Sequence, residues 1–68
     1  MSVARITEIS ATSTKSFEDA IAQGIARASK TLRGIQSAWI KEQKVDVRGD
    51  KISDYRVNLL VTFVLEAE

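Results

Sequence analysis

From Tyr55 to Glu66 the chain alternates in steps of two, with an apolar side chain at every odd position. Such alternation is the pattern of a β-strand. The even positions are mixed rather than uniformly polar, and they include Leu60 and Val64. A strand that is apolar on one face and half-apolar on the other belongs in the middle of a sheet and needs cover on both faces. The pattern therefore predicts a central strand with more apolar surface than one helix can cover.

The length of 68 residues predicts a single domain, residues 1–68, near the lower size limit for a self-sufficient core. Domains this small usually rely on disulfides, a metal ion or oligomerisation. The sequence contains no Cys and no His, which excludes disulfides and Cys/His zinc sites and leaves oligomerisation. The absence of cysteine also fits a reducing compartment, so we expect a cytoplasmic protein.

Charge and composition exclude several classes of function. The formal net charge is +1 and the charges are interspersed, so the sequence lacks the basic patch of a nucleic-acid-binding protein. No apolar run reaches membrane-spanning length, and Arg5 and Glu8 interrupt the N-terminal apolar residues, unlike in a signal peptide. Without His, Cys or a Gly-rich phosphate loop, the residues predict no catalytic site, and we expect no enzyme.

The first half of the chain predicts an edge strand followed by a helix. Residues 3–10 are expected to form the strand, and the Ser- and Thr-rich junction 11–15 is expected to place the helix N-cap near Ser13. From Phe17 to Leu32 apolar residues recur at steps of three and four, and Gly34 follows as a stop. The small residues of this stripe would let the helix lie close to a sheet: Ala20, Gly24 and Ala28.

Residues 35–47 are expected to form a second strand, joined to the last one by a two-residue type II′ turn at Gly49 and Asp50. Counting outward from this turn places Ala38 and Ile40 on the helix-covered face, opposite Val61 and Leu59. The opposite face then carries four opposed pairs: Ser37 with Thr62, Trp39 with Leu60, Lys41 with Asn58, and Gln43 with Arg56.

The elements together predict an α+β fold in the order strand, helix, strand, strand. The last strand is expected to lie between the first two and antiparallel to both, with the helix on one face. The other face carries Trp39 and Leu60 among polar residues and has no cover. A subunit with such a face is expected to form a homo-oligomer.

Four segments carry a resemblance to a known family: Ala-Thr-Ser-Thr-Lys-Ser-Phe-Glu-Asp-Ala-Ile (11–21), Ala-Ser-Lys-Thr-Leu (28–32), Tyr-Arg-Val (55–57) and Val-Thr-Phe (61–63). Through them the whole chain resembles the dodecins, which are small bacterial and archaeal proteins. The resemblance implies a three-stranded antiparallel sheet partly wrapped around one helix. It also implies a hollow homododecamer of cubic-type symmetry that holds flavin in pairs at subunit junctions, for storage and without turnover.

The resemblance also implies where a flavin (riboflavin, FMN or FAD) would bind. Flavin-binding dodecins stack the flavin ring on a Trp near the start of the second strand, and Ser37 stands at that position here. The single tryptophan, Trp39, follows two residues later, about 6.6 Å further along the same face. Those relatives carry Gln after the closing-strand Tyr, where this chain has Arg56. With Gln43 and Asn58 as further polar groups, the candidate flavin-binding residues are Ser37, Trp39, Gln43, Arg56 and Asn58.

Two alternatives stay open at these positions. Trp39 either stacks on a flavin or packs across a subunit contact, where Trp is enriched. Arg56 either binds a phosphate or a flavin carbonyl, or it pairs with Asp54 or with Glu42 of a neighbour.

A flavin-free shell is the alternative function. Dodecin-like proteins that have Arg after the Tyr and lack the Trp have been linked to calcium, so this shell would bind a metal ion such as calcium at subunit junctions. No EF-hand spacing occurs, and a single chain is not expected to supply a metal site. The carboxylates concerned lie around the second turn and in the tail: Asp46, Asp50, Asp54, Glu66 and Glu68.

Overall fold

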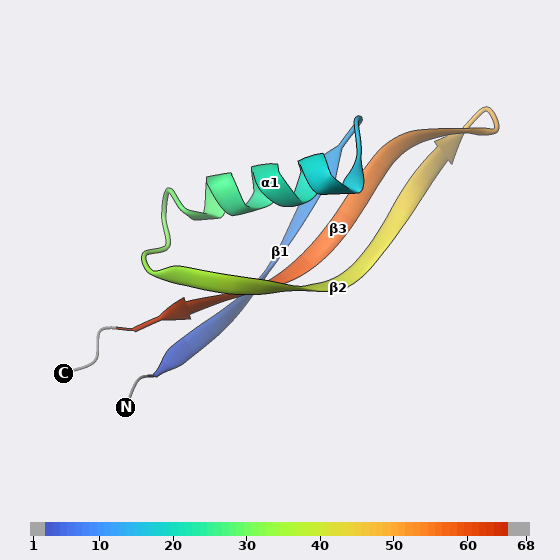
Figure 1. Ribbon diagram of the computed structural model, residues 1–68. Coiled ribbons are helices and arrows are strands. Elements are labelled where there is room, and N and C mark those ends of the chain that lie inside the picture. Colours follow the sequence, from blue (N-terminus) through green and yellow to red (C-terminus); the bar gives the residue numbers. More distant parts are fainter. Residues whose placement is uncertain (1–2, 66–68) are drawn as a thin grey trace.

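The computed structural model describes residues 3–65, which form β1 (Ala4–Ser13), α1 (Phe17–Ala28), β2 (Ile35–Arg48) and β3 (Lys51–Val64). The three strands make one antiparallel sheet in the order β1-β3-β2. Helix α1 lies on one face of this sheet, and no helix of the described residues lies over the other face (Figure 1). The predicted α+β architecture, with the last strand in the centre, is confirmed.

The core lies between α1 and the central strand. Val57, Leu59 and Val61 of β3 are completely buried, as is Ala20 of the helix. These three β3 residues belong to the odd-numbered set whose alternation predicted a central strand. Apolar side chains that pack around this core come from β1, α1 and the first half of β2: Ile9, Ala11, Phe17, Ile21, Ile25, Ile35 and Ala38.

The start of α1 differs from the prediction by three residues. Its N-cap is Ser16, whose hydroxyl accepts a 2.9 Å hydrogen bond from the backbone N–H of Asp19. Ser13 instead ends β1, where its hydroxyl donates a 2.6 Å hydrogen bond to Asp19 and accepts one from the backbone N–H of Lys15. The junction offers several hydroxyl side chains, and Ser16 is the one that directly precedes the apolar stripe.

The helix ends at Ala28, earlier than the apolar stripe to Leu32 predicted. Hydroxyl groups compete with the backbone there, since Ser29 donates to the Ile25 carbonyl at 2.8 Å and Thr31 to the Ala28 carbonyl at 3.4 Å. The backbone N–H groups of Lys30 and Thr31 donate to the carbonyls three residues earlier, so the chain continues as one tightened turn after the helix. Within residues 3–65, no helix has the length and apolarity needed to cross a membrane.

The β2–β3 turn is at Gly49 and Asp50, as predicted, but its predicted type is wrong. Both residues have positive φ, 58° and 65° respectively. Positive φ at both central positions defines a type I′ turn, whereas type II′ requires it only at the first. The aspartate adopts the left-handed conformation that Asn and Asp tolerate better than other non-glycine residues.

The β2–β3 hairpin extends beyond the N-terminal end of α1, and we call its protruding part, residues 45–55, the arm (Figure 1). The arm makes the molecule elongated, with principal extents of 54 × 19 × 13 Å and a radius of gyration of 14.1 Å. A compact domain of this length would have a radius of gyration of about 11 Å. The accessible surface is 5128 Å², against about 4250 Å² for a compact monomer of this mass. The additional accessible surface area is about as large as the area that one partner buries in a standard protein–protein interface.

Candidate functional site

The far face of the sheet, meaning the face turned away from α1, exposes a large aromatic side chain. Trp39 of β2 lies opposite Leu60 of β3 and is 59% exposed. Ile6 of β1 lies on the same face opposite Thr62 and is 53% exposed. Exposed apolar side chains grouped on an uncovered sheet are typical of a binding or subunit-contact surface.

An ion pair crosses this face beside the tryptophan. The ammonium group of Lys41 on β2 lies 3.3 Å from the carboxylate of Glu8 on β1, so the pair spans the central strand. Both side chains are about half exposed, and such a pair contributes little to stability. Its main effect is to place charge at one border of the apolar surface around Trp39.

A β-bulge at Lys41 changes the predicted pairing of the polar residues. The ladder runs from Ile40 opposite Leu59 to Glu42 opposite Asn58, so Lys41 has no partner. The predicted pairs of Lys41 with Asn58 and of Gln43 with Arg56 are therefore wrong. Gln43 lies opposite Val57, which is buried on the helix-covered side, and Lys44 lies opposite Arg56. Directly opposed residues share a face, so Gln43 belongs to the other face from Asn58 and Arg56.

Arg56 is engaged within its own chain. Its guanidinium donates a 2.9 Å hydrogen bond to the carboxylate of Asp46 on β2. This bond, more than the charge attraction, raises the pKa of Arg56 and lowers the pKa of Asp46, while partial burial opposes both shifts. The Arg56 Nε atom is out of contact with solvent and has no hydrogen-bond partner among the described residues. The Nε–H donor of the guanidinium is therefore buried without a partner in the described part of the chain.

A depression of about 360 Å³ adjoins this arginine. It is lined by Glu42, Gln43, Lys44, Arg56 and Asn58, and the Asn58 amide donates a 3.0 Å hydrogen bond to Glu42. Along β3, Asn58 is two residues and Arg56 four residues from Leu60, the partner of Trp39. Those steps correspond to about 6.6 and 13 Å. A flat ligand on the indole therefore reaches Asn58 before it reaches Arg56.

Four of the five candidate residues share one face. Ser37 lies opposite Thr62 and Trp39 opposite Leu60, in line with Asn58 and Arg56 on β3. The small, exposed Ser37 leaves open the space beside the indole. Gln43 is the candidate whose register belongs to the other face, although the residue borders the depression beside Arg56.

The carboxylates around the turn do not converge on a cation site within residues 3–65, where no group of three or more potential ligands occurs. Asp46 and Asp54 lie directly opposite each other, but Asp46 is bonded to Arg56 and Asp54 accepts a 3.2 Å hydrogen bond from Ser53. Glu66 and Glu68 lie outside the described residues.

The sequence reasoning missed the partner of Arg56 and the bulge. Asp54 or a neighbour's Glu42 was one alternative as partner of Arg56, beside a phosphate or a flavin carbonyl, whereas the structure pairs Arg56 with Asp46. The bulge had a signal in the sequence, because apolar residues on β2 occupy even positions at Ala38 and Ile40 and odd positions at Val45 and Val47. Such a change of phase within one strand indicates an inserted residue.

Comparison with known proteins gives a consistent assignment. A model of the Dodecin family matches residues 3–66. A solved protein from Thermus thermophilus is 34% identical, with 100% of each chain covered and a TM-score of 0.93. Dodecin from Streptomyces davaonensis is 30% identical, with 97% of each chain covered and a TM-score of 0.91.

A third similar structure is a calcium-chelating antigen, calcium dodecin from Mycobacterium tuberculosis, whose structure is described as having a novel calcium-binding site. It is 33% identical over 97% of this chain and 94% of that chain, with a TM-score of 0.81. No curated protein sequence matches the chain significantly. The match of the family model to residues 3–66, together with these structures, shows that the chain belongs to the dodecin family.

Proposed function

We propose that this chain is the subunit of a cytoplasmic homo-oligomeric shell, a dodecamer, that binds flavin between subunits and stores it without turnover. Dodecins are small binding and storage proteins that form homo-oligomeric shells. The observation that carries the flavin proposal is Trp39, which is 59% exposed on a sheet face over which no helix or strand of residues 3–65 lies. A bare indole on a flat sheet suits the stacking of a large aromatic ring.

The polar groups near Trp39 fit the edge of a flavin ring in part. Asn58 can offer amide hydrogen-bonding groups to ring carbonyls and nitrogens, and the Arg56 guanidinium lies further along the strand. Both side chains already have partners within the chain, Glu42 and Asp46 respectively. Flavin binding through them therefore requires shared or exchanged hydrogen bonds, so the stacking on Trp39 supplies the main attraction.

Flavin fluorescence tests this proposal. Riboflavin, FMN and FAD are each titrated with the purified protein, and stacking on the indole should quench their emission at micromolar concentrations. Trp39→Ala should remove the quenching and leave the assembly mass unchanged in size-exclusion chromatography. Val3→Ala, which trims another exposed apolar side chain, is the matched control and should quench like the unmodified chain. Undiminished emission with the unmodified protein contradicts flavin binding.

A flavin-free shell that binds calcium is the second candidate. It is favoured by the engagement of Arg56 with Asp46 and by Ser37 at the position where flavin binders carry their Trp. The similarity to the calcium dodecin of Mycobacterium tuberculosis supports the choice of ion. Thermal melting with calcium and then with excess chelator tests it: a stabilisation that the chelator reverses supports a calcium site, and identical melting curves contradict it.

A further inference from the structure

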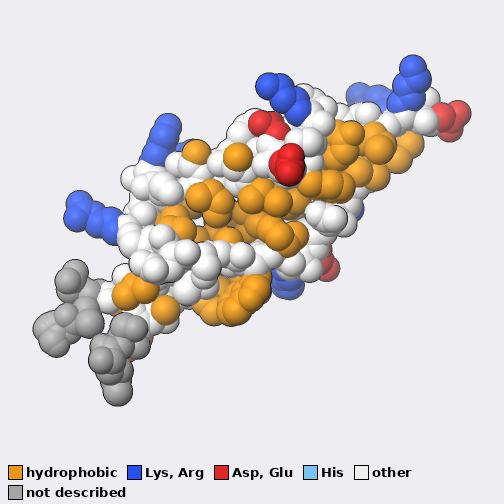
Figure 2. Space-filling model, in the orientation of Figure 1, with side chains coloured by type: hydrophobic (Ala, Val, Ile, Leu, Met, Phe, Trp, Pro, Cys, Tyr) orange, Lys and Arg blue, Asp and Glu red, His pale blue; other side chains and the backbone are white. Residues whose placement is uncertain are grey.

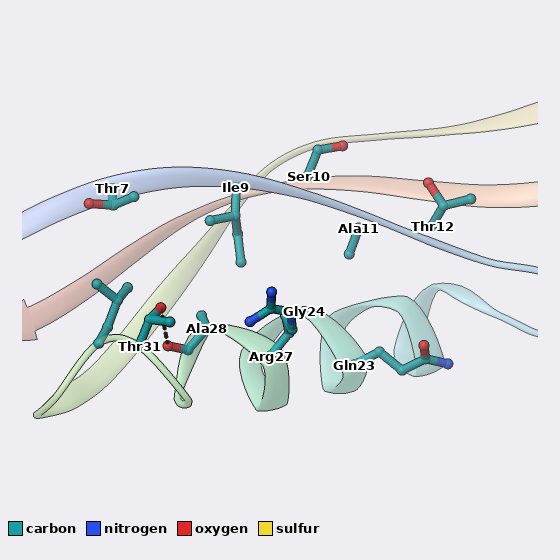
Figure 3. A pocket seen from close by; sticks show the side chains of 11 residues that line it. Thr7, Ile9, Ser10, Ala11, Thr12, Gln23, Gly24, Arg27, Ala28 and Thr31 are labelled. Atoms are coloured by element: carbon teal, nitrogen blue, oxygen red, sulfur yellow. Dashed lines mark hydrogen bonds between the residues drawn. The ribbon is translucent and has the colours of Figure 1, made fainter.

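Apolar surface alone does not single out a ligand site on this molecule. Figure 2 shows hydrophobic side chains in a band along the molecule, with charged side chains mostly at its margins. A groove of about 590 Å³ lies between β1 and α1, where Ile9 and Ala11 point from the strand towards the helix (Figure 3). Among the described residues that line this groove, Arg27 carries the one charge, and none has an aromatic ring or a carboxylate. The far face differs, because a carboxylate lies there beside the aromatic side chain of Trp39.

Glu42 of β2 and Asn58 of β3 form a hydrogen-bonding pair beside Trp39. They lie directly opposite each other, and the Asn58 amide donates a 3.0 Å hydrogen bond to Oε1 of Glu42. Along β3, Asn58 is two residues from Leu60, the partner of Trp39, which is a step of about 6.6 Å. A hydrogen bond spans about 2.9 Å, so a bicyclic ring centred over the indole brings its rim within hydrogen-bonding reach of the Glu42–Asn58 pair.

The Glu42–Asn58 pair offers two acceptors followed by one donor. The carboxylate of Glu42 only accepts hydrogen bonds, and its Oε2 has no partner among the described residues. Its Oε1 keeps a second lone pair beside the bond from Asn58. The Asn58 amide nitrogen carries two N–H groups, of which one is used for Glu42 and the other is free. From β2 to β3 the order is therefore acceptor, acceptor, donor.

We infer that the Glu42–Asn58 pair selects bicyclic ligands that contain a 2-amino-4-oxopyrimidine ring, the ring that pterins and guanine share. This ring presents two donors followed by an acceptor along one edge: the 2-amino group, the ring N–H and the 4-oxo group. The two N–H groups donate to the two oxygens of Glu42, and the oxo group accepts from the free N–H of Asn58. Hydrogen bonds to a carboxylate are stronger than those between neutral groups. The bond within the pair is kept, so ligand binding requires no rearrangement of either side chain.

A flavin ring complements the same pair less well. Its pyrimidine edge presents a carbonyl, an N–H and a second carbonyl, which is the order acceptor, donor, acceptor. The N–H donates to one oxygen of Glu42 and one carbonyl accepts from Asn58, but the other carbonyl faces the second carboxylate oxygen. Two acceptors then meet without a hydrogen between them, and an unpaired polar group in a contact lowers affinity. This inference rests on the stacking at Trp39 that the proposed function assumes, and it names a second class of ligand for that surface.

The remainder of the ligand points away from the Glu42–Asn58 pair. Ser37 and Thr62 lie opposite each other on the other side of Trp39 and Leu60 from Asn58. The side chain of a pterin and the ribose of guanosine leave the bicycle at the end remote from the aminopyrimidine edge, so they extend over Ser37 and Thr62. Ser37 is small and exposed, which leaves room for a hydroxylated substituent there.

Pterin and lumazine are a matched pair of ligands for the test. They share the pteridine bicycle and differ only at position 2, where pterin has an amino group and lumazine a carbonyl. Equilibrium dialysis against the purified, assembled protein at pH 7 measures both dissociation constants, and pterin should bind about tenfold more tightly, the effect of one hydrogen bond. Guanosine and inosine, which lacks the 2-amino group, form the second pair, and guanosine should bind more tightly. Whichever of pterin and guanosine binds more tightly identifies the source of the ring. Quenching of the emission of Trp39, the single tryptophan, reports stacking on the indole.

Glu42→Gln assigns the preference to its residue. The substitution replaces one acceptor by an N–H donor at an exposed position, so lumazine should then bind at least as tightly as pterin. Glu18→Gln makes the same change at an exposed position of α1 and should keep the preference for pterin.

The outcomes separate this inference from the flavin proposal. Equal or tighter binding of lumazine by the unmodified chain, no binding of either pteridine, or a preference for pterin that survives in Glu42→Gln overturns the inference. Riboflavin is dialysed in parallel. Binding of riboflavin without pterin overturns the inference and leaves the flavin proposal standing, whereas binding of pterin without riboflavin supports the inference and contradicts the flavin proposal.

Discussion

Glu42 of β2 lies opposite Asn58 of β3 and accepts a 3.0 Å hydrogen bond from its amide, although a regular ladder counted from the turn would place Lys41 there. The extra residue turns the following side chains of β2 to the other face, so Val45 and Val47 lie on the helix-covered side of the sheet. Beyond the Lys41–Glu8 ion pair, Glu42 and Lys44 are consequently the β2 residues that continue the polar surface beside Trp39.

This register gives a prediction for ligand binding that separates two neighbouring residues. Gln43→Ala should leave flavin affinity within a factor of two, because Gln43 lies opposite Val57 on the helix-covered side. Asn58→Ala should weaken binding by about five- to tenfold, the loss of roughly 1 kcal/mol for one hydrogen bond. Fluorescence titration of both variants with the same flavin measures the difference. A larger loss for Gln43→Ala would mean that the bulge is absent from the assembled protein.

Close packing of α1 on β1 gives a prediction for stability. A Cβ atom built on Gly24 would lie 3.1 Å from the Ala11 Cβ and 3.3 Å from the Leu59 Cδ1. Gly24→Ala should therefore destabilise the fold by about 1 kcal/mol net, since overpacking outweighs the gain of roughly 1 kcal/mol in helix propensity. Urea denaturation measures this change. Ala11→Gly should relieve the contact and restore part of the loss in the double variant, and an additive result would contradict the clash.

The sequence predicted the parts of the fold that hydrophobic periodicity controls. Val57, Leu59 and Val61 alternate without interruption, so the central strand, its buried face and the position of the helix followed from it. The bulge lies in the run from Lys41 to Lys44, which is polar and exposed throughout, so no apolar side chain marks the slip within that run. The change of phase becomes visible only at Val45.

In the candidate site, only the residues on the regular part of the ladder could be placed from the sequence. Ser37 and Trp39 lie between the irregularity after Ile35 and the bulge at Lys41, in a part of the ladder whose register was predicted correctly. The pairing of Arg56 with Asp46 was not predictable, because it depends on the shifted register and on which of several nearby carboxylates a long side chain reaches. The protruding arm was not predicted either. Apolar alternation indicates where a strand runs, but it does not indicate where the helix that covers the strand begins or ends.

The type I′ turn can be verified by substitution at its second central position. Asp50 has a φ of 65°, so Asp50→Val should destabilise the hairpin by about 1–2 kcal/mol, the cost of the left-handed region for a non-glycine residue. Asp50→Asn is the matched control and should change stability by only a few tenths of that, because Asn tolerates this conformation. Thermal denaturation of the two variants is the measurement. Equal stability of Asp50→Val and Asp50→Asn would favour the type II′ turn, in which the second central residue has a negative φ.

The Asp46–Arg56 pair makes stability depend on pH in a defined direction. The hydrogen bond from Arg56 lowers the pKa of Asp46 below its ordinary value of 3.8. A carboxyl group with a lowered pKa in the folded state stabilises the fold above its unfolded pKa, and this stabilisation disappears as the pH falls through the folded value. Asp46→Asn should therefore be less stable than the unmodified chain at pH 7, and the two should converge as the pH falls below 3.8.

Urea midpoints measured between pH 7 and pH 2 give this convergence, and the Arg56→Met background supplies its control. Without the guanidinium, Asp46 has lost the hydrogen bond that is the main cause of its lowered pKa, so Asp46→Asn should have little pH-dependent effect there. The pKa of Asp19 is also lowered, chiefly by the hydrogen bond from Ser13, so its protonation also reduces the stability of the fold at low pH. This loss of stability is the same with and without the Arg56→Met substitution, and it cancels when the two backgrounds are compared. A gap between Asp46→Asn and the unmodified chain that persists at pH 2 would show that Asp46 stabilises the hairpin through packing rather than charge.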